Sequence, residues 1–525
     1  MAGLLDERLS GRPISGEVHN LNLLVLHLLK VLNGRPAVTT VCTRINDYFP
    51  CLNHCFLYSY VIAHEFFSNK SHERAKDRYN SSMKLLSLLS LCVACSPTSV
   101  KIGGVSSGDS SFETGNSNFN PFEGTVDPSE DDSEDGSGED DGDNSDDGDA
   151  TDPPPFDGNT RKWTIMVYLA GDNNLEDPAL VDLNEMEIAG STEDVNILVE
   201  IDRSPDHSTA EGDWSGARRY LVEQDDNRNS IGSSVQVELG EVDSGSTEAY
   251  IDFIEWGVEN FPAEQYALII WNHGWGWTIA PRSGRKGISS DDESGNSISI
   301  VNGEYEEILS AAKAATGDRL TMVGMDACLM GNWEIARITA EYADVYVASQ
   351  ATESIDGWAF DTALSDLNDS PEMDAEELGI TFAERFHETG DSTLSVVDLS
   401  ELTAIDGAID ALADSILAKE NPKPNVRPQA RRAQKFDGDP NDKDFRDFLQ
   451  RMAIESEDDD IAEASDDLNV ELDEAILANF TNGGWVRDAT GLSIYIPTNN
   501  DYDPNYMEGR WNEFTRWGEV VEAVK

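Results

Sequence analysis

Basic residues are scarce in this chain of 525 residues. Lys and Arg number 37 against 101 Asp and Glu, which gives a formal net charge of −64 at pH 7. Proteins that bind nucleic acid or anionic membranes use clustered Lys and Arg to displace counterions, so we expect no nucleic-acid partner. Hydrophobic residues still make up 39% of the chain, which is enough for a packed core and excludes wholesale disorder.

Long apolar runs are missing as well. None approaches the ~18 residues that a membrane-spanning helix needs, the longest being 21–32 and 85–94. The second follows Met83 and precedes Cys95, an order of charge, apolar stretch and small residue that resembles a bacterial lipoprotein signal. This resemblance implies acylation of Cys95, translation from Met83, residues 1–82 as an upstream extension, and a lipid-anchored protein of the cell envelope. A buried apolar helix is the alternative.

The next segment has almost no residues that could form a core. Residues 96–160 carry 18 acidic residues and one basic residue, and 127–152 alone contains 14 Asp or Glu interleaved with Gly and Ser. Such a composition buries too little apolar surface to offset the entropy of ordering the chain. We expect a disordered acidic linker between a signal at 83–95 and a folded domain at 161–525, with the lipid anchor as the membrane contact.

Within 161–525 the pattern changes to short apolar runs that alternate with amphipathic segments. Near-continuous hydrophobicity is typical of strands covered on both faces. Strands that alternate with helices predict an α/β fold with a largely parallel sheet and helices on both faces. The expected strands are 163–170, 195–202, 266–272, 321–327, 345–350, 393–399 and 491–497, and the clearest helices are 248–261, 304–315 and 332–343.

Cysteine is nearly absent from this domain. Five of the six Cys lie at or before position 95, which leaves Cys328 alone, with His207, His273 and His387 as the domain's histidines. A lone Cys cannot form an internal disulfide, and no Cys/His cluster has the spacing of a zinc site. Cys328 is therefore either a small buried hydrophobe or a nucleophile.

His273 and Cys328 each follow an expected strand directly. If 266–272 and 321–327 are neighbours, ~4.8 Å apart, both residues leave the sheet side by side at the edge where such sheets bind ligands. An imidazole can deprotonate a thiol of reference pKa ~8.5 and later protonate a leaving amine. Gly274 permits close approach of the chains, and the amides of Gly274 and Cys328 could hold an oxyanion. Either residue alone is more often a packing residue, but the joint arrangement favours chemistry.

Six segments, in this order, resemble the clostripain-like cysteine peptidases. The resemblance spans about 163–525 and implies a caspase-like three-layer sandwich with a mostly parallel central sheet and a Cys/His dyad without an obligatory third residue. His273 matches the family's catalytic histidine and Cys328 its nucleophile. The segments are WTIMVYLAGDNNLE, IIWNHGWGW, GISSDDESG, MDACLMGNWEIA, ASQATES and GLSIYIP.

The resemblance also implies substrates, because members of the family cleave proteins and peptides after Arg or Lys. That preference requires an acidic pocket beside the nucleophile. Asp326 lies two residues before Cys328 and points to the same side of an extended chain, where its carboxylate would pair with a basic side chain. Asp356 is a second candidate, with a helix N-cap or a turn as its alternative role.

Relatives are often cut into two chains that stay together. We expect self-cleavage after Arg285 or Lys286, in a Gly/Ser loop shortly after His273. The competing site is the basic segment 421–436, whose Pro content predicts an exposed loop. That segment could equally be a docking patch.

The chemistry requires no cofactor. Calcium dependence is known in the family, so calcium is a possible addition for which Asp291, Asp292 and Glu293 could supply oxygen ligands, although three adjacent acids are usually a solvated loop. Two alternatives to the peptidase hypothesis remain open. One is a catalytically silent acidic surface-binding domain on the same fold, and the other is a caspase-like peptidase with a different specificity, such as Asn or Asp.

Overall fold

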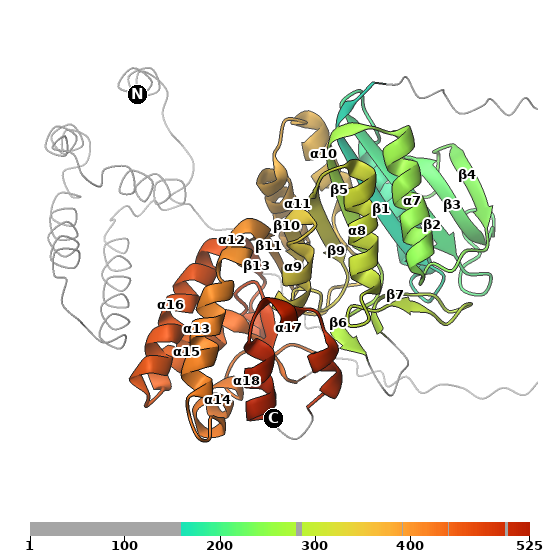
Figure 1. The fold of residues 1–525 in the computed structure, drawn as a ribbon. Coiled ribbons are helices and arrows are strands. Elements are labelled where there is room, and N and C mark those ends of the chain that lie inside the picture. The colour runs from blue at the N-terminus through green and yellow to red at the C-terminus, as the bar shows by residue number, and fades with distance from the viewer. Residues whose placement is uncertain (1–158, 280–285, 391, 439, 499–501) are drawn as a thin grey trace, which may run out of the picture. The chain divides into compact units, whose positions relative to one another are not determined.

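A large mixed sheet organises the part of the chain that the computed structural model describes, namely residues 159–279, 286–390, 392–438, 440–498 and 502–525. All of these residues fall within one compact unit. In spatial order the strands of the sheet are β13 (Ile476–Thr481), β11 (Thr393–Asp398), β10 (Ala343–Ala348), β9 (Leu320–Asp326), β5 (Ala263–Trp271), β1 (Arg161–Gly171), β2 (Val195–Arg203), β3 (Gly216–Leu221) and β4 (Val235–Gly240) (Figure 1).

The centre of this sheet is parallel and its two sides are antiparallel. Strands β10, β9, β5, β1 and β2 run parallel to one another. On one side β11 and β13 pair antiparallel, and on the other side β3 and β4 do the same. The predicted parallel sheet is therefore confirmed at the centre. The sequence did not indicate β3, β4 and β13, because strands at the sides are only partly buried and lack continuous apolar runs.

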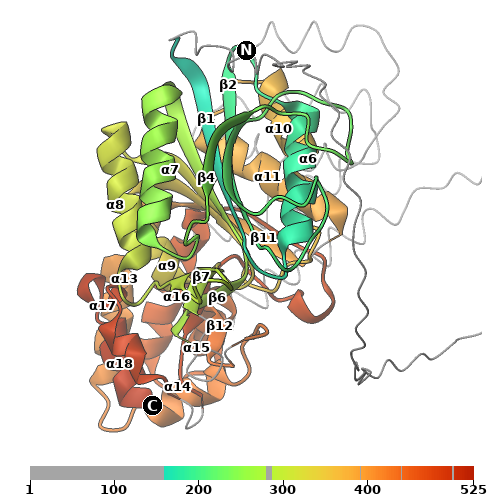
Figure 2. The same cartoon turned by 90° about the vertical axis from the view of Figure 1, so that its right-hand side faces the viewer.

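Helices cover both faces of the sheet, because alternate apolar side chains of β1 point to opposite faces and both sets are buried. Ile165, Val167 and Leu169 face one hydrophobic core, whereas Met166 and Tyr168 face the other. Figure 2 shows these helical layers on opposite sides of the sheet. The first core contains residues of α6 (Glu176–Ala189), α10 (Phe360–Asp369) and α11 (Ala375–Thr389), and the second contains residues of α7 (Thr247–Asn260), α8 (Glu304–Thr316) and α9 (Trp333–Thr339).

A group of C-terminal helices extends the second core at one end of the sheet (Figure 1). Two predictions fail here. The expected strand 491–497 shortens to β14 (Ser493–Tyr495), which pairs with β12 (Asp442–Asp444) outside the main sheet. The group consists of α12 (Leu399–Ala404), α13 (Asp406–Leu417), α14 (Lys423–Ala430), α15 (Phe445–Glu455), α16 (Asp459–Ala475), α17 (Trp511–Phe514) and α18 (Trp517–Val524).

The second failure concerns the basic segment 421–436, which was predicted to be an exposed loop. Most of it forms α14, with one proline in the first turn and Pro428 inside the helix. Val426 and Ala430 are fully buried, so tertiary packing outweighs the helix-breaking tendency of proline. A protease would have to unfold this helix to cut it.

A small antiparallel sheet follows β5 directly. It consists of β6 (Gly274–Ile279), β7 (Lys286–Ser290) and β8 (Ser297–Ile298). Lys286 is thus the first residue of β7, whereas Arg285 lies outside the described residues, as do Cys95, the expected signal and the expected linker. Among the helices that the structure describes, none is both long and apolar enough to cross a membrane.

Candidate active site

The loops that carry His273 and Cys328 leave neighbouring strands and touch. Strands β5 and β9 pair with Trp271 opposite Asp326, as expected, and the Asn272 amide donates to the Asp326 carbonyl at 3.3 Å. A Cβ added to Gly274 would fall 2.2 Å from the carbonyl oxygen of Cys328. Only glycine fits at this position, so the two loops make main-chain contact directly after His273.

The sulfur of Cys328 lies against the loop that follows β10. The backbone amide of Glu353 donates to Sγ at 3.3 Å, and Cys328 takes part in no disulfide. Sγ in turn lies 3.9 Å from the Glu353 carbonyl, to which the thiol donates, so Glu353 contacts the sulfur through both of its main-chain polar groups. No pattern of residue types indicates this contact, because Glu353 acts through its main chain.

The turn after Cys328 is strained and is held in place by packing. Leu329 has φ of 64°, in the left-handed region that costs a non-glycine residue about 1 kcal/mol or more. Its buried side chain packs in a small cluster with Phe436 and Val486. These contacts fix the direction in which the chain leaves Cys328.

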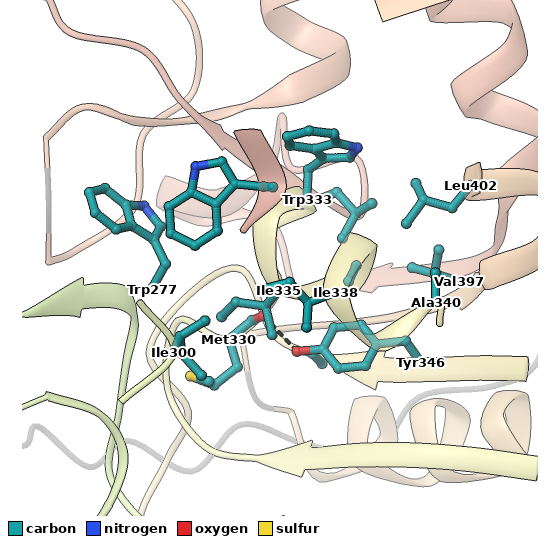
Figure 3. Close-up of a cluster of buried hydrophobic side chains, with 14 of the residues drawn as sticks. Trp277, Ile300, Met330, Trp333, Ile335, Ile338, Ala340, Tyr346, Val397 and Leu402 are labelled. Atoms are coloured by element: carbon teal, nitrogen blue, oxygen red, sulfur yellow. Dashed lines mark hydrogen bonds between the residues drawn. The ribbon is translucent and has the colours of Figure 1, made fainter. Parts of the chain in front are cut away.

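Apolar packing also fixes the segment that follows this turn. Figure 3 shows Met330 and Trp333 within a buried cluster, where the Tyr346 hydroxyl donates to the Met330 carbonyl at 2.9 Å. Trp333 and Tyr346 are both fully buried. Side chains packed at this density hold the adjoining loop to a narrow range of positions.

His273 is oriented by two asparagines. Its Nε2 lies 3.0 Å from Oδ1 of Asn174, and its backbone amide donates to Oδ1 of Asn272 at 2.5 Å. Oδ1 of Asn272 also accepts from the amide of Ser290 at 3.2 Å, which ties β7 to the same loop. Because Asn174 Oδ1 can only accept, this contact places a proton on Nε2 and leaves Nδ1 as the basic nitrogen.

Asp326 faces a second buried carboxylate that the sequence did not reveal. Asp326 is 4% exposed and accepts from the Trp358 amide at 3.1 Å. A Cβ on Gly357 would lie 2.9 Å from Oδ2 of Asp182 and 3.3 Å from Oδ2 of Asp326. Oδ2 of Asp182 has no hydrogen-bond partner among the described residues, and burial together with the charge of Asp326 raises the pKa of Asp182 well above its usual range.

Asp356 lies at the exposed rim of this pair. Its amide donates to Oγ of Ser354 at 3.0 Å, which makes it a turn residue rather than a helix N-cap. Its negative charge contributes to the raised pKa of Asp182, after burial, Asp326 and Glu185. Burial, with the charge of Asp361 as the next cause, raises the pKa of Glu185 to about 7. Four carboxylates therefore share one region beside Cys328.

The acidic segment 291–293 does not act as one unit. Asp291 is buried, whereas Asp292 and Glu293 are exposed, and Asp292 lies 3.4 Å from Nε2 of His207. Asp291 instead meets two buried acids from other elements, Asp172 and Asp202.

The residues that the sequence analysis missed divide into two kinds. Asp172 and Asn174 directly follow β1, so the rule that singled out His273 and Cys328 would have found them. Asp202 is, like Glu200, an acid inside a fully buried strand, which is also a readable signal. Asp182 lies on α6, which is buried on several sides, and no pattern in the sequence distinguishes it from the other acids of that helix.

Comparisons with known proteins agree with this architecture. The clostripain family model matches residues 167–523. Clostripain of Hathewaya histolytica is 28% identical over 315 residues, which cover 51% of this chain and 58% of that protein. A secreted C11 cysteine protease of Bacteroides thetaiotaomicron in complex with an irreversible peptide inhibitor gives a TM-score of 0.51 at 19% identity, over 68% of this chain and 99% of the other. Iotapain, from the same organism, gives a TM-score of 0.52 at 14% identity, over 68% of this chain and 99% of the other.

The fold and the match together define a class: the chain has the caspase-like α/β sandwich of the C11 peptidases. Within that class the chain belongs to the clostripain family, since the family model covers more than half of its length, including His273 and Cys328. The matched region spans less than two thirds of the clostripain sequence itself.

Proposed function

We propose that the protein is a cysteine endopeptidase that hydrolyses peptide bonds after Arg or Lys. The observation that carries this proposal is the main-chain contact of Gly274 with Cys328 at the carboxyl ends of β5 and β9. That contact supports a dyad in which the His273 imidazole and the Cys328 thiol share one rim. The family to which the chain belongs supports the reaction class.

The proposed reaction begins with proton transfer from Sγ of Cys328 to Nδ1 of His273, while Asn174 keeps Nε2 protonated and the ring oriented. The thiolate attacks the substrate carbonyl carbon, and the oxyanion forms beside the amides of Gly274 and Cys328. The imidazolium gives its proton to the leaving amine, which departs and leaves a thioester. His273 then takes a proton from water, which attacks the thioester and releases the carboxylic acid with Cys328 regenerated.

Asp326 would select the basic side chain on the substrate, with Asp182 behind it and Asp356 at the rim. Two buried carboxylates on either side of Gly357 repel each other, and a guanidinium or ammonium bound beside them would relieve that repulsion. Glycine at position 357 leaves room for a long substrate side chain. This arrangement favours Arg and Lys over the neutral or acidic residues of the alternative specificities.

We propose that the protein works outside the cytoplasm, anchored through Cys95. The signal-like order around residues 83–95 supports this location, as does the description of the relative from Bacteroides thetaiotaomicron as secreted. We further propose self-cleavage after Arg285 or Lys286. Mass spectrometry of purified active protein should show two chains, and an Arg285→Gln, Lys286→Gln double variant should show one. A single intact chain in fully active wild-type protein would refute this step.

A peptide-library digest that compares the wild type with Cys328→Ala tests the function. We expect cleavage after Arg and Lys by the wild type and none by the variant, a loss of at least about 10⁴-fold. An intact wild type that cuts nothing would favour the silent surface-binding domain. Cleavage after Asn or Asp would favour the alternative specificity.

Gly274→Ala tests the observation that carries the proposal. The added methyl would push the Cys328 carbonyl away and displace the two loops, and a shift of about 1 Å in a catalytic group can cost ~10²-fold in rate. Gly407→Ala is the matched control, because a Cβ there meets no atom within 4 Å. If Gly274→Ala folds and retains the kcat/KM of the control, the close approach has no catalytic role.

A further inference from the structure

Two large apolar side chains are exposed on loops at the edge of the sheet that carries the nucleophile. Ile355, in the loop after β10, is 63% exposed, the highest value among the large apolar side chains of the described residues. Trp485 is 49% exposed and lies in η2 (Gly484–Val486), a short 3₁₀ helix after β13. Single exposed apolar residues are common, whereas apolar residues grouped at a functional edge indicate an apolar ligand. Their placement therefore decides what they mean.

The loops that carry these two residues leave the sheet at the same edge as the nucleophile. Strand β10 runs parallel to β9, and β11 pairs antiparallel with both β10 and β13, so β9, β10 and β13 all run in the same direction. The Ser392 hydroxyl donates to the Thr352 carbonyl at 2.6 Å, and the Asn482 amide donates to the Ser392 carbonyl at 3.1 Å. The segment before β11 thus ties the loop after β13 to the loop after β10.

Ile355 lies between the nucleophile and the acidic pocket. Two residues before it, the amide and the carbonyl of Glu353 contact Sγ of Cys328. Two residues after it, Gly357 lies against both buried carboxylates of the proposed pocket for a basic side chain. The Gly357 amide donates to the Ser354 carbonyl at 3.3 Å, which closes the turn that carries Ile355. A substrate that reaches from the thiol into the pocket would therefore pass Ile355.

Trp485 is carried by a turn that packs against the nucleophile loop. Its neighbour Val486 is buried in the same cluster as Leu329, and Cys328 packs against that cluster. The Thr481 hydroxyl donates to the Val486 carbonyl at 3.1 Å, which fixes the backbone of the turn. A Trp side chain has only two rotatable bonds, so it provides a large contact area at a low cost in conformational entropy.

The order of the strands indicates which part of a substrate these side chains would meet. His273, the proposed proton donor to the leaving amine, follows β5, whereas Ile355 and Trp485 follow strands on the other side of β9. The leaving amine would therefore lie on the β5 side of Cys328, and the acyl part of the substrate would extend toward β10. Successive side chains of an extended peptide point to opposite sides, so the residue directly before the basic one stays outside the acidic pocket.

We propose that Ile355 and Trp485 form a subsite for a bulky apolar side chain, such as Leu or Phe, directly before the Arg or Lys of the substrate. Removal of apolar surface from water on both partners favours such a residue over a small one. The inference rests on the proposed function, because it extends the same substrate site by one residue. The protein would thus select segments with an apolar-basic pair from among all accessible Arg and Lys residues.

Cleavage of matched peptides tests the subsite. A peptide with Leu before Arg should have a kcat/KM at least about fivefold higher than the same peptide with Ala, because part of the Leu side chain would be buried. An Ile355→Ala, Trp485→Ala double variant should reduce this Leu:Ala ratio to less than about twofold. Val470→Ala is the matched control and should keep the wild-type ratio, since Val470 is 56% exposed on α16, in the C-terminal group of helices.

The ratio separates loss of the subsite from general damage to the enzyme, because a distorted active site would slow both peptides alike. An unchanged ratio in the double variant would overturn the subsite. So would a wild type that cleaves after Arg without regard to the preceding residue, and either result would leave the proposed function intact. If the double variant does not fold, Ile355→Ala alone serves in its place, with the same expected direction.

Peptide binding to Cys328→Ala provides a second readout that needs no turnover. Isothermal titration should show tighter binding of the Leu-Arg peptide than of the Ala-Arg peptide, and adding the double substitution should remove the difference. Equal binding of the two peptides by Cys328→Ala would overturn the subsite. If the wild type cleaves nothing, the proposed function fails, and this titration still decides whether the subsite exists.

Discussion

Two groups of buried acids lie at the same edge of the sheet, and they differ in the loops and side chains that surround them. Asp326 and Asp182 face each other across Gly357, beside the loop that carries Cys328. Asp172, Asp202 and Asp291 are enclosed by the loops after β1, β2 and β7. We infer that the first group receives its positive charge from each substrate, whereas in the second group Asp291 accepts hydrogen bonds from the amides of Ser244 and Ser294. The same unfavourable burial thus supports recognition in one place and loop order in the other.

Among substitutions in these two groups, Asp326→Asn should cause the largest loss of activity on Arg substrates. The loss of one partner of a buried charge pair costs about 2–5 kcal/mol. The kcat/KM for Arg substrates should therefore fall by a factor between about 30 and several thousand. The measurement is hydrolysis of matched Arg and Ala peptides. Alkylation of Cys328 by a small reagent should continue at the wild-type rate.

Asp202→Asn, assayed with the same peptides, is the contrast to Asp326→Asn. It should lower turnover of Arg and neutral peptides by the same factor, because it acts on loop order and not on the substrate side chain. A selective loss of Arg cleavage in Asp202→Asn, or unchanged Arg turnover in Asp326→Asn, would break the division of roles between the two groups.

Asp182→Asn should have an intermediate effect on activity and a distinctive effect on stability. Because its pKa is raised in the folded protein, Asp182 keeps a proton that the unfolded chain releases above pH ~4, so its contribution to folding falls as pH rises. The variant should match the wild type near pH 4 and have the higher Tm at pH 8. Turnover of Arg peptides should drop about 5- to 30-fold. Equal dependence of Tm on pH in both proteins would show that Asp182 is ionised in the free enzyme.

Asp356→Asn should have the smallest effect. The residue is exposed, and solvent-exposed charges contribute little and are screened by salt. We expect less than about fivefold loss of Arg turnover, and a difference that shrinks as ionic strength rises. A loss as large as that of Asp326→Asn would show that the exposed Asp356, and not the buried pair, selects the basic side chain.

The parts of the fold that could be predicted from sequence are those with a strong burial signal. The five central strands are largely apolar because helices cover both of their faces, so their existence and parallel order followed from the pattern, as did the contact between the loops after β5 and β9. Strands β3, β4 and β13 carry alternating or charged residues and are stabilised by pairing to a sheet that local sequence does not reveal. Helix α14 forms despite its prolines because Val426 and Ala430 are buried by neighbours distant in the chain.

The candidate site divides in the same way. Asp326 was predicted because it lies two residues before Cys328, at the end of β9. Asp182 approaches Gly357 from α6, more than a hundred residues before Asp326 in the chain, and only tertiary structure brings the two acids together. The contact of Glu353 with Cys328 is made by a backbone amide, which every non-proline residue has.

The rate at which iodoacetamide alkylates Cys328, measured against pH in the wild type and in His273→Gln, tests the central claim most directly. If the imidazole shares the thiol proton, the wild type should react fully well below the thiol's ordinary pKa of ~8.5, and His273→Gln should react only as pH approaches that value. Coincident profiles for the two proteins would contradict the account, because they would mean that His273 does not control the ionisation of Cys328.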